Sequence, residues 1–291
     1  MQPPGPPSTR VRRLAAVLGG LLAALALALG TPPTTPAGAE HVTPTCPTGV
    51  DTDPEGWVCM VLNYNAGPGP ALAAVTTRVD QLAASGRAAV TEAIVFSDAS
   101  LAREIATVYQ DDLGRSPEAG GTSYWTGVIR AQRSELPFEL GVFGSPEYQS
   151  RFASFQASLI PVYERFLGRS PETAGLSFWT LELTSGRMSA GAIYGAIATS
   201  TEAGAQRSTR LYGHYLLRTP DASGHAYWTD QADDAGLLRI TAAFATTDEA
   251  FVKLAARGRC LAGDPAVCPP PTTTTAPTTS TTGPTTSTTG P

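Results

Sequence analysis

Apolar residues recur at intervals of three or four in three stretches of the chain, which is the spacing of one buried face of an α-helix. The stretches are Ile105, Val108, Tyr109 and Leu113; Val162, Tyr163, Phe166 and Leu167; and Leu211, Tyr212, Tyr215 and Leu216. This periodicity predicts an all-α fold in which each stretch is a helix packed on its apolar side.

Each of these helices leads into the same phrase, which combines a glycine or leucine, an arginine, a proline, an acid, a second glycine and an aromatic-Trp pair. The copies are LGRSPEAGGTSYW at 113–125, LGRSPETAGLSFW at 167–179 and LLRTPDASGHAYW at 216–228. Their tryptophans, Trp125, Trp179 and Trp228, are 54 and 49 residues apart. A period of about fifty residues predicts tandem helical repeats.

The phrase has the signals of a turn between two helices. Gly114 and Gly168 suit the left-handed position at which a helix ends, and Leu217 departs from this rule. In the first copy Ser116 is the expected N-cap and Pro117 the first helical residue, so that the acid faces the positive end of the helix dipole. The second glycine of each copy is expected to permit close packing against a neighbouring backbone; these glycines are Gly121, Gly175 and Gly224.

A further helix is predicted in each unit, at about 136–144, 189–199 and 237–246, followed by a second cap signal. These signals are Ser145-Pro146-Glu147, Ser200-Thr201-Glu202 and Thr247-Asp248-Glu249. The connecting helix after the first of them contains Pro161, where a break is expected.

The predicted organisation is therefore three units of about 50 residues preceded by a half-unit that caps the array. The boundaries are 71–99 for the half-unit, 100–149 and 150–206 for the first two repeats, and 207–268 for the third repeat with a C-terminal cap. Residues 40–70 are rich in Pro, Gly, Thr and Asp, and an irregular N-terminal segment pinned by a disulfide is expected there.

These phrases, together with the later Ser-x-Glu, resemble the bacterial repeat family called Domain of Unknown Function 4214 (DUF4214). The likeness extends over about 100–252 and the half-unit, with departures at Leu217 and Thr219. The resemblance implies secreted or surface proteins, helical and often multidomain, with no established catalytic activity. It also implies a distant similarity to the linker domain of phycobilisomes, which is an assembly module.

The two ends of the chain predict export. Residues 1–39 read as a signal peptide, because three arginines precede an uncharged run at 14–29 and a small-residue cleavage site at 37–39. That run of about 16 residues is shorter than the ~20 of a spanning helix, so no transmembrane span is expected after cleavage. Residues 269–291 are almost entirely Thr, Pro, Ser and Gly, which predicts a disordered stalk. The protein is expected outside the cell or in the cell envelope.

Net charge limits the classes of binding partner, and cysteine spacing limits the possible disulfides and metal sites. Cleavage removes three of the 20 basic residues, so 17 remain against 25 acids, a net charge of −8 that argues against nucleic acid. The four cysteines lie in two pairs at the edges of the repeats. Of three possible connectivities we favour Cys46–Cys59 and Cys260–Cys268. Zinc is not favoured, because neither pair has C-x-x-C spacing or a nearby histidine.

The recurring arginines and tryptophans are the candidate binding residues. Trp125, Trp179 and Trp228 are either sugar-stacking platforms or core anchors of their units, and the second reading is favoured. Arg115, Arg169 and Arg218 either bind an anionic polymer or pair with helix ends and acids of adjoining units, again with the second favoured. The acids Glu118, Glu172 and Asp221 are explained by helix capping, so no metal site or cofactor is predicted.

No catalytic residue is assigned. The three histidines, His41, His214 and His225, match no triad or metal spacing, and no nucleophile-elbow, zincin or phosphate-loop motif occurs. The sequence therefore predicts a secreted non-catalytic module for adhesion, matrix association or assembly. Its expected partners are other surface or matrix proteins, or cell-wall polysaccharide. The alternatives are a glycan- or cell-wall-binding module and a secreted hydrolase that uses two carboxylates.

Overall fold

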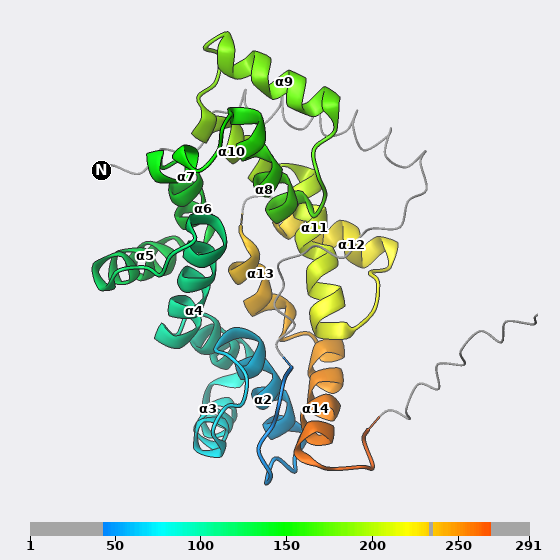
Figure 1. Ribbon diagram of the computed structural model, residues 1–291. Helices are drawn as coiled ribbons and strands as arrows, with labels where there is room; N and C mark the ends of the chain where they lie inside the picture. Colours follow the sequence, from blue (N-terminus) through cyan, green and yellow to red (C-terminus); the bar gives the residue numbers. More distant parts are fainter. Residues whose placement is uncertain (1–42, 233–234, 269–291) are drawn as a thin grey trace, which may run out of the picture.

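The computed structural model describes residues 43–232 and 235–268, which form an all-helical body (Figure 1). The predicted signal peptide and stalk lie outside these residues. The helices are α2 (Asp53–Asn65), α3 (Leu72–Val95), α4 (Asp98–Val108), the π-helical turn η1 (Tyr109–Leu113), α5 (Ala119–Gln132), α6 (Leu136–Phe143), α7 (Pro146–Ser150), α8 (Phe155–Leu167), α9 (Thr173–Thr184), α10 (Ala190–Ala198), α11 (Thr201–Leu211), η2 (Tyr212–Leu216), α12 (Ala222–Ala232), α13 (Leu237–Phe244) and α14 (Asp248–Ala262). No helix in the described part of the chain is both long and apolar enough to span a lipid bilayer.

The buried side chains form two clusters. One joins α4, α6, α8 and α10, and includes Phe138, Phe143 and Tyr194. The other joins α2 and α3 to the last third of the chain, and includes Trp57, Tyr215 and Phe244. The first helices therefore pack with the last ones, and the predicted half-unit shares its core with the third repeat.

The contact that joins the two ends of the body is between α2 and α14, which lie side by side in Figure 1. Glycine is required on both helices. A Cβ atom on Gly56 would lie 2.3 Å from the carbonyl oxygen of Ala255, and one on Gly258 would lie 2.1 Å from the carbonyl oxygen of Gly56. An Arg259–Asp53 ion pair of 2.8 Å and a hydrogen bond from the Trp57 indole to the carbonyl of Ala245, 3.0 Å, add to this contact.

The expectation of an irregular segment at 40–70 is wrong for Asp53–Asn65, which form α2. Thr52 and Glu55 form a capping box: the Thr52 hydroxyl accepts the N–H of Glu55, whose carboxylate accepts the N–H of Thr52 at 2.9 Å. Trp57 is fully buried, so this segment contributes to the core. Its proline and acids are those of a helix start.

Both predicted disulfides are confirmed. Cys46 is bonded to Cys59 on α2, and Cys260 on α14 is bonded to Cys268. Each bond joins a residue near one end of the described chain to one of the two helices, α2 or α14, that pack together.

The helices of the recurring phrase begin later than expected. α5 and α9 start after Glu118 and Glu172, with no side-chain cap, so the serines before the prolines are not N-caps. The left-handed turns before them are confirmed at Gly114 and Gly168, both with φ +67°. Leu217 adopts the same left-handed conformation, φ +53°, at a conformational cost that glycine does not have.

The second cap signals are confirmed. Ser145, Ser200 and Thr247 accept the N–H of the residue three positions later at 3.1, 3.2 and 3.3 Å. The break expected at Pro161 is absent, since α8 continues through it. Leu159 and Val162 on either side are fully buried, and this packing offsets the backbone hydrogen bond that proline removes.

Candidate functional site

The three arginines of the recurring phrase each lie at the centre of an ion-pair group, which we call an arginine station. At the first, Arg115 bonds both oxygens of Glu147, at 2.5 and 2.9 Å, and Glu118 at 2.8 Å. Its guanidinium lies over the ring of Tyr109, with 4.9 Å between the guanidinium carbon and the ring centroid. Glu147 belongs to the second cap signal of the same unit, so the station links the two signals across 32 residues.

The same geometry recurs at the other two arginines. Arg169 bonds Glu172 and both oxygens of Glu202, and lies 5.2 Å from the Tyr163 ring. The third station contains Arg218, Asp221, Glu249 and Tyr212, with bonds of 2.8 and 2.7 Å to the two oxygens of Glu249 and a guanidinium–ring distance of 4.7 Å.

The phrase's tryptophan and second glycine complete the station. The indole N–H of Trp125 donates to the Tyr109 hydroxyl at 3.1 Å, and that of Trp179 to the Tyr163 hydroxyl at 2.8 Å. A Cβ atom on Gly175 would lie 2.9 Å from the Tyr163 hydroxyl and 3.0 Å from the Glu172 carboxylate. The glycine therefore makes room for side chains, whereas the sequence predicted a neighbouring backbone.

The positive charge of each arginine in the phrase is paired with carboxylates of the same chain. Two carboxylates pair with every guanidinium, and at the third station Lys253 also pairs with Glu249, at 3.4 Å. These internal ion pairs argue against binding of an anionic polymer by the arginines. The Arg115 guanidinium lowers the pKa of Glu147 and of Glu118. At the third station the N–H of Gly224, the Ser223 hydroxyl and Arg218 lower the pKa of Asp221 to about 2.

Replacing Gly224 with alanine is expected to destabilise the protein by about 1–2 kcal/mol. The new Cβ would lie 2.0 Å from the hydroxyl of the buried Tyr212, and the clash outweighs the gain of up to ~1 kcal/mol in helix propensity. Gly127 on α5 is the matched control, because a Cβ there meets nothing within 4 Å and Gly127→Ala is expected to stabilise. Urea unfolding of both variants measures the two signs; equal effects would contradict the role given to Gly224.

The helices after the stations each carry one large exposed apolar or aromatic side chain. α5 and α12 each bury one residue and α9 buries two. Tyr124 is 53% exposed, Leu181 56% and Tyr227 58%, and Figure 1 shows α5 and α9 at the periphery of the body. The neighbouring tryptophans are half-buried, between the two alternatives drawn from the sequence.

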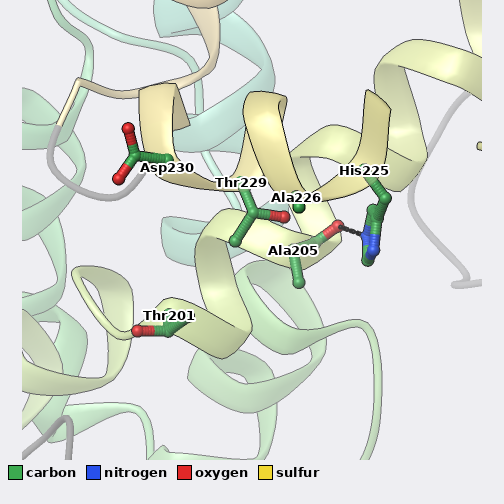
Figure 2. A pocket seen from close by; sticks show the side chains of 6 residues that line it. All are labelled: Thr201, Ala205, His225, Ala226, Thr229 and Asp230. Carbon is green, nitrogen blue, oxygen red and sulfur yellow. Dashed lines mark hydrogen bonds between the residues drawn. The ribbon is translucent and has the colours of Figure 1, made fainter. Parts of the chain in front are cut away.

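A shallow depression of about 440 Å³ lies between α11 and α12 (Figure 2). Figure 2 shows the His225 ring directed at the carbonyl of Ala205, at 3.1 Å. Thr229, also in the lining, has a buried hydroxyl oxygen without a hydrogen-bond partner. Among the six lining residues Asp230 is the one carboxylate, so the depression lacks the carboxylate pair of a glycoside hydrolase.

A second group of charges lies between α4, α6, α8 and α11 and escaped the sequence analysis. Arg165 bonds Glu139 at 2.6 Å and Glu104 at 3.3 Å, and lies 3.7 Å from Asp112. Glu139 and Asp112 are buried, and burial raises the pKa of Asp112 to about 6. The sequence held one hint, Glu135 and Glu139 one helical turn apart beside Phe138, where an apolar face was expected.

No group of three or more His, Cys, Asp or Glu side chains in the described ranges is arranged to hold a metal ion. The recurring phrase and the later cap signals are joined by ion pairs, and each arginine also contacts a tyrosine ring.

Comparison with known proteins yields one match. No curated protein and no solved structure matches the chain, so the similarity to phycobilisome linkers stays an expectation. Residues 141–207 match the family described as "Domain of unknown function (DUF4214)". The matched region contains Tyr163, Arg169, Glu172 and Glu202, so it includes the whole of the second arginine station. Residues 141–207 are therefore similar to the DUF4214 family, the one that the recurring phrase resembles.

Proposed function

We propose that this protein is a secreted, non-catalytic module that acts outside the cell or in the cell envelope by surface contact, in adhesion, matrix association or assembly. The observation that carries the proposal is the pair of exposed tyrosines on two peripheral helices, Tyr124 on α5 and Tyr227 on α12, with Leu181 exposed on α9. Tyrosine is enriched at protein contact sites.

Three further features support it. The arginine stations use the recurring charges of the phrase for ion pairs within the chain, which leaves the exposed tyrosines as the outward groups. The two disulfides suit an oxidising compartment. The depression between α11 and α12 has a single carboxylate in its lining, which favours contact over hydrolysis.

Retention of the full mature chain on purified cell walls and on immobilised envelope proteins tests the proposal. The double variant Tyr124→Ser/Tyr227→Ser is expected to lose at least about tenfold in retention, because each tyrosine supplies an aromatic contact. Val252→Ser is the matched control, since Val252 is 64% exposed but lies on α14, away from these helices.

The same material distinguishes the alternatives. If the chain is retained on polysaccharide alone and the double variant is not, Tyr124 and Tyr227 bind glycan, because sugars stack on aromatic rings. Release of sugars in proportion to added protein would overturn the non-catalytic reading. Equal retention of the wild type and the double variant on every material would overturn the role given to Tyr124 and Tyr227.

A further inference from the structure

Helix α13 is held at its start by a side chain from a distant part of the chain. The carboxylate of Glu135 accepts the N–H groups of Leu237 and Leu238, the first two residues of α13, the second at 3.0 Å. The residue before α13 is Gly236, which provides no side-chain cap. A Cβ on Gly236 would lie 2.6 Å from the Ser134 hydroxyl and 2.7 Å from a Glu135 oxygen, so glycine is needed for this approach.

α13 also connects the two cores. Ile240 and Phe244 belong to the cluster built on α2, α3 and α14. Leu238 and Ala242 pack against the other cluster, built on α4, α6, α8 and α10. The contact between Glu135 and α13 therefore affects how firmly the two halves of the body are joined.

Charged groups from several elements surround Glu135. Four carboxylates and four guanidinium groups lie in this region: Glu135 and Glu139 from α6 and its N-terminus, Glu104 and Arg103 from α4, Asp112 from η1, Arg165 from α8, and Arg207 and Arg210 from α11. Arg239 on α13 itself is exposed, and Asp233 and Asp234 lie outside the described residues. Glu135 and Glu139 are one helical turn apart, so a proton on Glu135 removes the repulsion between these two buried carboxylates.

The surroundings of Glu135 favour that proton. Glu135, Glu139 and Arg207 are each less than a tenth exposed. Burial and the neighbouring Glu139 raise the pKa of Glu135 to about 7, against the opposing effects of Arg207 and of the backbone N–H groups. If α13 leaves, Glu135 regains solvent and its pKa falls towards the ordinary value. The docked state then holds more protons than the undocked state between these two values.

We infer that α13 is an acid-tightened latch: docking of α13 on Glu135 takes up a proton, so the two halves of the body are joined more firmly in mildly acidic surroundings than in alkaline ones. The two N–H groups are accepted by different oxygens of Glu135, and the protonated side chain keeps its carbonyl oxygen as an acceptor for one of them. Raising the pH removes the proton and weakens the docking, because it places a second negative charge beside Glu139 in buried surroundings, which is costly.

Hydrogen exchange of the full chain at about pH 5.5 and about pH 8, corrected for intrinsic rates, tests the latch. The protection of α13 relative to α2 is expected to be at least roughly tenfold higher at the lower pH. Glu135→Gln is expected to remove this pH dependence and to keep α13 protected at pH 8. The exposed Glu164→Gln on α8 is the matched control and is expected to behave as the wild type.

Two results would overturn the inference. Equal relative protection of α13 at both pH values in the wild type would show that no proton is taken up on docking. Loss of α13 protection in Glu135→Gln at both pH values would show that the negative charge holds the helix, and that the contact is an ordinary cap.

Discussion

Replacing Gly258 with alanine is expected to destabilise the protein by about 3 kcal/mol or more. The new Cβ would lie 2.1 Å from the carbonyl oxygen of Gly56 and 2.6 Å from its Cα atom, which are backbone atoms of α2. Backbone cannot move away as the end of a flexible side chain can, so α2 and α14 must separate. The separation also exposes Trp57, which is fully buried in this core.

Urea unfolding of the disulfide-bonded chain measures this loss. Gly120→Ala on α5 is the control, since a Cβ at Gly120 meets nothing within 4 Å and a small gain in stability is expected. A loss below about 1 kcal/mol in Gly258→Ala would mean that the two ends of the fold are not in close contact in solution.

Replacing Arg165 with methionine is expected to destabilise the protein by about 3–5 kcal/mol near pH 8, because it leaves Glu139 and Asp112 buried without their counter-charge. The loss should be smaller near pH 5. Burial raises the pKa of Asp112 to about 6 and also raises the pKa of Glu104, so these groups become neutral as the pH falls.

The sign of this pH dependence follows from proton binding. A carboxyl whose pKa is higher in the folded than in the unfolded chain binds more protons when folded, so the free energy of unfolding falls as the pH rises between the two values. The variant Arg165→Met/Glu139→Gln should recover part of the loss. Arg78→Met is the control, since Arg78 bonds only to the exposed Gln81 side chain among the contacts described for it. A loss that does not change with pH would contradict the charge account.

Local features were predicted well from the sequence. The caps at Ser145, Ser200 and Thr247, the left-handed turns at Gly114 and Gly168 and both disulfides depend on residues close together in the chain. Their physical causes act over one or two helical turns, so residue type and spacing suffice to identify them.

The start of α5 shows where local rules failed. Ser116 and Pro117 are the residue types of an N-cap and a first helical turn. Glu118 instead forms an ion pair with Arg115, and α5 begins at Ala119, directly after Glu118. Arg115 also pairs with Glu147, which is 32 residues away. Residue spacing near the helix start does not reveal this long-range contact.

The features that the sequence did not predict are contacts between residues more than 100 positions apart. α2 was missed because the residues around it are rich in Pro, Gly, Thr and Asp, although its own run at 57–62 is apolar. Its buried Trp57 is explained by packing on α14 and by the Ala245 carbonyl 188 residues away. The Glu135 contact with α13 spans 102 residues. A buried carboxylate at such a place has no sequence signal, because its partners are backbone N–H groups that every residue but proline provides.

The recurring phrase holds helices together through its arginine stations. A double-mutant cycle between Arg169→Met and Glu202→Gln, measured by urea unfolding, tests this role most directly. A coupling energy of about 1–2 kcal/mol is predicted, because the pair is bidentate, partly buried and placed over the Tyr163 ring. A coupling energy of about zero, with both single variants as stable as the wild type, would contradict the claim.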